Sequence, residues 1–428
     1  MKNDHIMQEI INKLLERGAD KVTLILIETR MEELQFEYNE IDLLRGYDEN
    51  SLSIKVIKDN KLASTSLNQM DEAALEAAMD QVLADAENSQ PDEAHDISPF
   101  QEAGSNIIGE LEPDRDRMYF LINEFLEERQ VNYPTLMAEG TLVHYLSQER
   151  YLNSNGVDFR ETQGGYIYTL MFSSRLGDKV SSFNYTYNIS RDLKKSFLEV
   201  GMTRDLIEQS IASMECRHIP DTFKGDVILV PGLVKEFWDS LILNQISDSP
   251  LINDSSVLKG KIGEKVLHES INLCSDPTSE DLANSYFSTK DGFRAEKVEI
   301  IGSGMLQNYL LSYYGSRKTG LPMSKARGCL IMSPGKDKLA DMIKNVKKGL
   351  LVVRFSGGGV SLNCDFSGVA KNSYYIENGE IMYPVNETMI SGNLLQLFNN
   401  IEGISDQILN NGDSKMPWLH CSGVTISK

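Results

Sequence analysis

The chain has 428 residues, of which 41% are hydrophobic and 25% are charged, and it contains 31 glycines and 12 prolines. These proportions are typical of a globular protein with about two to four domains, and they exclude collagen-like and low-complexity chains. Asp and Glu number 63 against 42 Lys and Arg, so the formal net charge is −21. Because a surface this acidic repels phosphate groups and anionic lipid, we expect no direct contact with nucleic acid or membranes.

The five cysteines are widely spaced and form no CxxC pair. An odd number without paired spacing indicates neither a disulfide framework nor a zinc knuckle, and it favours a reducing compartment. The N-terminal segment carries charges from its start and lacks the apolar core of a signal peptide. No stretch approaches the roughly 18 apolar residues of a membrane span, so we expect a cytoplasmic chain.

The sequence first predicts an α+β block at residues 1–90. Apolar residues at helical spacing predict a helix that ends at Gly18, and a second helix covers about 71–87. The segment 91–112 is polar and acidic and shows no periodicity, which is typical of a linker or an extended crossover. Three strand-like runs lie between the two helices, at 21–30, 33–44 and 51–67.

The same order then repeats in a second block at residues 113–218. A helix begins with Pro113 in its first turn, and another helix covers about 203–215. Turn-forming residues at 153–156 and 164–165 separate strand-like runs at 135–146, 149–158, 166–175 and 179–189. Two such blocks in succession indicate an internal duplication. The excess of strands over helices favours an antiparallel α+β arrangement over a doubly wound sheet.

Residues 219–428 predict a mainly antiparallel β domain with helices near 233–243 and 336–348. Within this domain the glycine run 357–359 directly follows a strand. Backbone without side chains lets a ligand or a peptide approach closely, although a glycine-rich turn or bulge explains the same pattern.

Several sequence motifs of catalytic sites are absent: a GxxxxGK[ST] phosphate loop, a GxSxG nucleophile turn and a GxGxxG dinucleotide fingerprint. The metal-binding motif HExxH has a partial counterpart in His268-Glu269, but Asn272 replaces its second histidine. The surrounding residues alternate like a strand, which would direct His268 and Glu269 to opposite faces. This segment therefore does not indicate a metal site.

Several phrases of the sequence together resemble one known family. They are 153–156 (NSNG), 258–264 (LKGKIGE), 291–293 (DGF), 365–370 (DFSGVA), 375–381 (YIENGEI) and 388–394 (TMISGNL). Their order, together with two α/β blocks ahead of a β-rich domain, is similar to the TldD/PmbA family. That family has been described both as a modulator of DNA gyrase and as a peptide-maturation protease.

TldD-like chains carry HExxH on the helix after the first strand of the C-terminal domain, and a late cysteine as a further zinc ligand. PmbA (TldE)-like chains lack that site and pair with a TldD-like subunit. In the corresponding helix of this chain, Lys235 and Asp239 occupy the positions of the two histidines, and Glu236 keeps the central carboxylate. An ammonium group has no lone pair for a metal, and one carboxylate does not complete a catalytic zinc site. The resemblance therefore implies a PmbA-like chain with degenerate metal-helix positions and no metal; Cys421, in the terminal strand pattern, is assigned no ligand role.

For such a chain the resemblance implies the non-catalytic subunit of a two-chain zinc metallopeptidase that cleaves peptides or unfolded protein. Zinc is expected in a TldD-like partner, and activity is expected only with that partner. Exposed strand edges and a glycine-rich wall would hold an extended peptide by strand addition. No catalytic residue is assigned, and the residues expected to bind peptide are Gly357, Gly358, Gly359, Asp365 and Ser367.

Two other hypotheses stay open. The first is a self-sufficient peptidase with an unusual site, for which His268, Asp365, Ser367 and Glu377 are available although no spacing joins them. The second is a non-enzymatic binding or regulatory scaffold, such as a homodimer that binds a basic protein surface. Whether the isolated chain is an enzyme is open at this stage.

Overall fold

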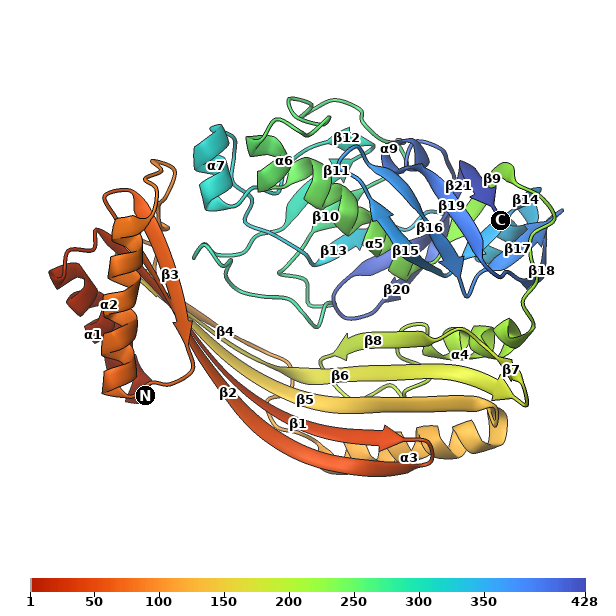
Figure 1. Cartoon of the computed structure of the whole chain (residues 1–428), viewed down its shortest axis with the longest axis horizontal. Coiled ribbons are helices and arrows are strands. Elements are labelled where there is room, and N and C mark those ends of the chain that lie inside the picture. The colour runs from red at the N-terminus through yellow and green to blue at the C-terminus, as the bar shows by residue number, and fades with distance from the viewer. Residues whose placement is uncertain (1) are drawn as a thin grey trace.

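The computed structural model describes residues 2–428, and the side chains of residues 5–428. A long, bent sheet forms the N-terminal part, and a β-rich C-terminal part lies in the hollow of this sheet (Figure 1). The elements of the N-terminal part are α1 (Lys2–Glu16), β1 (Lys21–Glu37), β2 (Glu40–Lys58), β3 (Lys61–Leu67), α2 (Glu72–Asn88), β4 (Gly104–Ile108), α3 (Arg115–Asn132), β5 (Leu136–Asn153), β6 (Asp158–Leu176), β7 (Lys179–Val180), β8 (Asn184–Ser190), α4 (Thr203–Ala212) and the 3-10 turn η1 (Ser213–Glu215). The elements of the C-terminal part are β9 (Phe223–Leu229), α5 (Pro231–Leu241), the π-helical turn η2 (Ile242–Ile246), α6 (Asp248–Ile252), β10 (Leu273–Ser275), β11 (Val298–Gly302), β12 (Met305–Leu306), α7 (Tyr313–Thr319), β13 (Leu330–Met332), α8 (Leu339–Asn345), β14 (Lys348–Val352), β15 (Arg354–Val360), β16 (Asp365–Lys371), β17 (Tyr374–Glu377), β18 (Glu380–Pro384), β19 (Thr388–Asn393), α9 (Leu394–Leu397), β20 (Ile401–Asn410) and β21 (Lys415–Ser427).

The two predicted N-terminal blocks share one sheet. Its strands are ordered β3-β2-β1-β5-β6-β4, and β7 and β8 also pair with β6. The junction is the antiparallel pair β1–β5, which runs from Thr23 opposite Asn153 to Glu37 opposite Glu139. The predicted α+β class with antiparallel sheets is confirmed. Strand β4, which comes from the segment 91–112, differs because it lies parallel to β6.

The strands of this sheet are longer than the sequence predicts. β1 and β2 are single strands of 17 and 19 residues, so the predicted break near residue 32 and the gap at 45–50 are wrong. The hairpin turns lie instead at residues 38–39 and 59–60, where Tyr38, Asp59 and Asn60 have φ values of +54°, +52° and +59°. Tight hairpins require positive φ, which Asn and Asp tolerate better than most side chains. The polar residues in the middle of β1 and β2 form no turn because they pair with one another across the two strands.

Gly164 and Gly165 lie inside β6, so the turn predicted there is also wrong. A Cβ atom on Gly164 would lie 2.0 Å from the carbonyl oxygen of Glu110, because the chain crosses the strand at this point. The glycine therefore permits a close approach of two backbones rather than a change of direction. The turn predicted at 153–156 is confirmed, and it joins β5 to β6.

Alternating side chains give the bent sheet a helix-covered face and a concave face. On the first face, one core includes Leu24 and packs against α1 and α2, and another includes Phe36 and packs against α3. Figure 1 shows these three helices on the outer side of the bend. On the concave face, Tyr151 and Phe159 form a small cluster with Phe287 of the C-terminal part.

The C-terminal part is built on a second sheet, ordered β12-β11-β10-β13-β21-β9-β14-β17-β18. The pairs β9–β14 and β13–β21 are parallel and the other strand pairs of this sheet, within residues 2–428, are antiparallel, which confirms the mainly antiparallel prediction. β15 pairs only with β16 among the described strands, so its second edge is open. The helix predicted at 336–348 is the shorter α8, because β14 already begins at Lys348. None of the helices in residues 2–428 is both long and apolar enough to cross a membrane.

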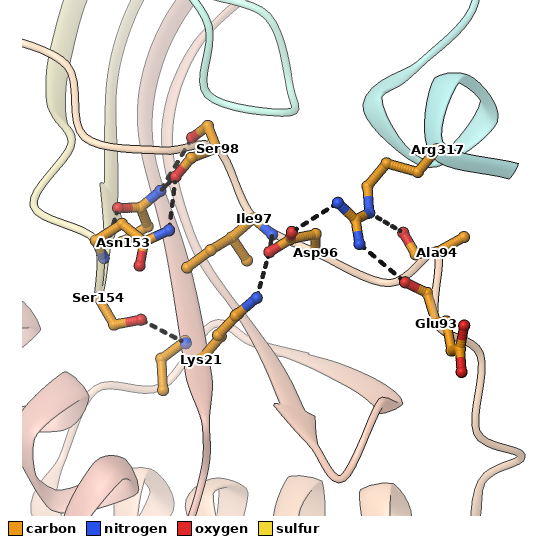
Figure 2. Close-up of polar contacts among 11 residues, drawn as sticks. Lys21, Glu93, Ala94, Asp96, Ile97, Ser98, Asn153, Ser154 and Arg317 are labelled. Atoms are coloured by element: carbon orange, nitrogen blue, oxygen red, sulfur yellow. Dashed lines mark hydrogen bonds and ion pairs between the residues drawn. The ribbon is translucent and has the colours of Figure 1, made fainter. Parts of the chain in front are cut away.

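The segment that follows α2 ties separate parts of the molecule together (Figure 2). The Asp96 carboxylate accepts a hydrogen bond from Lys21 Nζ at 2.5 Å and lies 3.1 Å from Arg317 Nη1. Arg317, in α7, also donates to two backbone carbonyl oxygens of the same segment. Asn153, the last residue of β5, donates through Nδ2 to the carbonyl and hydroxyl oxygens of Ser98. This stretch of the predicted linker is therefore held by both parts of the molecule.

We expect Asp96→Asn to lower the free energy of unfolding by about 1–2 kcal/mol, because hydrogen bonds to charged groups contribute about 1.5–3 kcal/mol and exposure reduces this value. Burial by itself raises the pKa of Asp96, but the Lys21 ammonium and the Ile97 N–H hold that pKa below its ordinary value. The stabilisation is therefore present above the ordinary carboxyl pKa and is lost as the pH falls through the folded-state pKa. Urea unfolding at neutral pH measures the loss of stability in Asp96→Asn. The same experiment at acidic pH measures whether the difference from the wild-type chain disappears.

Asp80→Asn is the matched control. Asp80 pairs with Arg17 at 2.8 Å, but 75% of its side chain is exposed, so this change should cost at most about 0.5 kcal/mol. Equal losses in the two variants would contradict the role given to Asp96.

Candidate functional site

The helix on which the resemblance places degenerate metal positions is α5, which follows β9 directly, as the sequence predicts for a helix near 233–243. A proline occupies its first turn, where the missing N–H costs no hydrogen bond. Phe237 and Trp238 are buried in the core of the C-terminal part. This packing leaves Lys235, Glu236 and Asp239 on the side of the helix that faces away from the core.

Lys235 forms the centre of a small ion cluster. Its Nζ donates to Asp239 Oδ2 at 2.7 Å and lies 3.5 Å from Oδ2 of Asp413, which is in the turn between β20 and β21. Burial by itself would lower the pKa of Lys235, but the hydrogen bond to Asp239 and the charge of Asp413 outweigh it and raise that pKa. The side chain therefore remains an ammonium at neutral pH.

This ion cluster does not fit a catalytic zinc ion. Lys235 has no lone pair to offer a metal, and it occupies the carboxylate oxygens of Asp239 and Asp413 that would have to supply the ligands. Within residues 5–428, no three His, Cys, Asp or Glu side chains are placed to hold a metal together. Cys421 is fully buried in β21, and burial raises the pKa of its thiol, so it does not supply a thiolate.

α5 forms one wall of a cavity of about 300 Å³ between the two parts of the molecule. β8 forms the opposite wall, and the start of β15 and the β20–β21 turn complete it. Tyr185 and Tyr187 of β8 are 51% and 50% exposed towards this space. Arg354 places its guanidinium carbon 4.7 Å from the centre of the Tyr185 ring and donates to the carbonyl oxygen of Phe183. The cavity thus combines aromatic rings with cationic and acidic groups.

Glu236 is the acidic group of this cavity that has no close cation partner among the described residues. Water reaches its side chain, but the protein on both sides of the cavity removes part of its hydration. This desolvation raises the pKa of Glu236, the charge of Arg354 acts in the opposite direction, and the charge of Asp239 raises the pKa further. Such a carboxyl can accept hydrogen bonds from a ligand and can hold a proton more readily than an ordinary glutamate.

The predicted glycine run lies on the open strand β15, and all three glycines are exposed. Gly357 has a φ of +67°, in the region that favours glycine. A Cβ atom on Gly358 would lie 1.7 Å from the carbonyl oxygen of Ser367, whereas a Cβ on Gly359 would meet nothing within 4 Å. The run therefore includes a bulge against β16 and an unobstructed outer surface at Gly359.

Asp365 and Ser367 lie on β16, next to the glycine run. Ser367 is the register partner of Gly359, and Asp365 Oδ1 accepts a hydrogen bond from Asn393 Nδ2 at 2.9 Å. The five residues predicted to bind peptide are thus brought together on one pair of strands. β15 begins at Arg354, which lines the cavity beside α5. The glycine run lies further along the same strand, outside the lining of that cavity.

The residues available for a self-sufficient peptidase do not meet in this way. His268 lies in a turn rather than a strand, contrary to the sequence prediction, and its Nδ1 shares a hydrogen bond with a neighbouring serine. Glu377 lies on β17 and accepts a hydrogen bond from Tyr375. Asp365 and Ser367 lie on β16, which does not pair with β17.

Sequence reasoning missed four residues of the α5 cavity, namely Tyr185, Tyr187, Arg354 and Asp413. A signal was available for the two tyrosines, because aromatic residues at 183, 185 and 187 alternate and so place their rings on one face of a strand. No local signal links Arg354 or Asp413 to α5.

Comparison with known proteins supports the resemblance described above. Residues 222–428 match the family model described as the PmbA/TldA metallopeptidase C-terminal domain. A metalloprotease PmbA homolog from Haemophilus influenzae is 24% identical over 419 residues, covering 92% of this chain and 87% of the relative. The metalloprotease PmbA from Escherichia coli is 24% identical over 430 residues, covering 94% and 92%. Other relatives are named TldD homologs.

A solved structure shows the same fold along the whole chain. TldE from Thermococcus kodakarensis has a TM-score of 0.86 and 19% sequence identity, and the match covers 99% of this chain and 100% of that one. The similarity to the TldD/PmbA family and the predicted fold class are therefore confirmed.

We expect the Glu236 carboxyl to titrate above the ordinary glutamate value of about 4.3. Arg354→Gln should raise this pKa further, because the guanidinium favours the ionised form, and Asp239→Asn should lower it. Carboxyl-detected NMR titration measures the Glu236 pKa in the wild-type chain, in Arg354→Gln and in Asp239→Asn. Arg30→Gln, which removes a guanidinium paired with Asp48 in the N-terminal sheet, is the control and should leave Glu236 unchanged. A Glu236 pKa at or below the ordinary value would refute this description of the cavity.

Proposed function

We propose that this chain, which is similar to the TldD/PmbA family, is the non-catalytic subunit of a two-chain metallopeptidase that cleaves peptides or unfolded protein. A TldD-like partner would supply the zinc ion, and this chain would shape the cavity and bind the substrate. We place this activity in the cytoplasm, because the five widely spaced, unpaired cysteines favour a reducing compartment.

The observation that carries the proposal is the ion cluster on α5. The helix lies beside an open cavity, but the ammonium of Lys235, which cannot bind a metal, pairs with the carboxylates of Asp239 and Asp413. A cation that activates water for peptide hydrolysis would therefore come from another chain. Relatives with names of both branches, PmbA and TldD, support such a pairing.

Substrate binding is proposed at the open edge of β15. An extended peptide can pair with an unpaired strand edge through its backbone, which binds peptides with little dependence on their side chains. Gly357, Gly358 and Gly359 leave this edge bare, and Asp365 and Ser367 lie beside it. A folded protein has few free backbone groups to offer to such an edge, so unfolded or short peptides are the substrates that fit.

We expect the purified chain alone to contain less than stoichiometric zinc and to cleave no peptide. Addition of the TldD homologue of the same organism, with zinc, should produce peptidase activity that a chelator removes. Metal analysis by mass spectrometry and cleavage of an unstructured peptide measure both outcomes. An isolated chain that holds one zinc ion and cleaves the peptide would refute the proposal. Failure to form a complex with the TldD homologue would favour a separate binding or regulatory role.

We expect Gly359→Val to raise KM for an unstructured peptide about tenfold in the two-chain complex, with little change in kcat. The backbone at Gly359 has room for a side chain, so this variant should fold, but the valine would occupy the space that a peptide needs. Far-ultraviolet circular dichroism tests whether the variant folds, and steady-state kinetics measures its KM and kcat.

Two other variants make this test specific. Glu380→Val places the same side chain on β18, an edge strand at the other side of the sheet, and should leave KM unchanged. Gly358→Ala should disrupt the β15–β16 pair, because its Cβ would overlap the Ser367 carbonyl oxygen. An unchanged KM in folded Gly359→Val would exclude β15 as the peptide-binding edge.

A further inference from the structure

A second cavity, of about 310 Å³, lies between the bent sheet and the C-terminal part, away from α5 and β15. β5 and β6 form one wall. The connection between β10 and β11 reaches towards the concave face of the sheet (Figure 1), and residues 286–291 of this connection form the opposite wall. Residues 311–312 and 324–327 complete the lining.

The wall on the sheet carries two adjacent carboxyl groups. Glu149 of β5 and Glu161 of β6 are register partners, so their side chains leave the same face next to each other. Glu161 accepts a hydrogen bond from the N–H of Phe287, whereas Glu149 has no hydrogen bond or ion pair with any described residue. Burial raises the pKa of Glu149. Burial also raises the pKa of Glu161, to about 7. The hydrogen bond from the Phe287 N–H acts in the opposite direction, and the charge of Glu149 raises this pKa further. The wall thus holds a carboxylate pair without a counter-ion.

The lining outside the sheet carries two cations, Lys290 on the opposite wall and Arg327 in the segment 324–327, and neither forms an ion pair with the described residues. The charge of Lys290 acts on Glu149, but the two groups are too far apart for an ion pair. Two other polar groups of the lining are already occupied: Gln163 donates its amide hydrogens to backbone carbonyl oxygens, and the Asp291 carboxylate accepts the first N–H of α7. Two carboxyl groups without a cation partner therefore share the cavity with two cations that have no ion pair among the described residues.

We propose that this cavity binds a small zwitterion, either a free amino acid or a dipeptide. The ammonium group of the ligand lies between Glu149 and Glu161, and its carboxylate faces Lys290 and Arg327. Charge-assisted hydrogen bonds of this kind are stronger than neutral ones, and the ammonium supplies the counter-charge that the two adjacent carboxyl groups lack.

The remaining lining determines the size and the character of the ligand. Leu311 and Ala326 are buried apolar residues that contact the cavity, so an apolar side chain fits better than a charged one. The volume lies at the lower end of the range of about 300–1,000 Å³ for ligand pockets, which suits a ligand of one or two residues. The proposal is independent of the peptidase role, because the site contains none of the α5 or β15 residues and its occupancy is measurable on the isolated chain.

Isothermal titration calorimetry of the full chain at pH 7.5 tests the site with L-leucine and alanyl-leucine as probes. At least one of the two probes should bind, and Glu149→Gln should weaken that binding at least tenfold. N-acetyl-leucine, which lacks the ammonium, should not bind. Leucinamide, which lacks the carboxylate, should bind more weakly than leucine, and Arg327→Gln should weaken leucine binding without affecting leucinamide.

Glu139→Gln is the matched control, because Glu139 lies on β5 outside this cavity. Glu149→Gln removes a charge that has no partner, so this variant should fold, and its thermal unfolding checks this. A probe that binds should raise Tm of the wild-type chain and of Glu139→Gln by the same amount, and should raise Tm of Glu149→Gln by less. Two results would overturn the proposal: no binding of either probe to the folded wild-type chain, or equal affinity of a probe for the wild-type chain and for Glu149→Gln.

Discussion

The antiparallel pairing of β1 with β5 is the interaction on which the rest of the structure depends. It joins two blocks that are separated in the chain into one sheet, and it continues without a break from Thr23–Asn153 to Glu37–Glu139. Because side chains alternate along each strand, helices cover one face of this sheet while the concave face stays free for the C-terminal part. Both interdomain cavities lie along that free face.

The two cavities differ in how their charges are balanced. Beside α5, the ammonium of Lys235 already has two carboxylate partners, Asp239 and Asp413. In the second cavity, Glu149 and Lys290 remain apart, and a small zwitterion can complete the charges on both walls. In the first cavity the only cation of the cluster is paired within the protein, whereas in the second, proposed site the charged groups have no ion-pair partners among the described residues.

The sequence predicted most elements but placed several strand ends wrongly. The polar residues between 45 and 50 predict a break, but they pair across β1 and β2. The glycines at 164–165 predict a turn, but Gly164 instead lets the backbone at Glu110 pass close to β6. In both cases a local pattern had a non-local cause. Residues such as Asp59 and Asn60 at positive φ were the better turn signal, because hairpin geometry itself requires that conformation.

The sequence by itself determined the α+β class and the β-rich C-terminal domain, because both follow from the periodicity of apolar residues. The tertiary structure alone decided that Asp413 lies beside Lys235, that Arg354 covers Tyr185, and that Glu149 and Glu161 share one cavity. These neighbours come together through strand pairing and through loops that cross between the two parts of the molecule. Residues so far apart in the chain share no periodic pattern, so their contacts leave no signal in a single sequence.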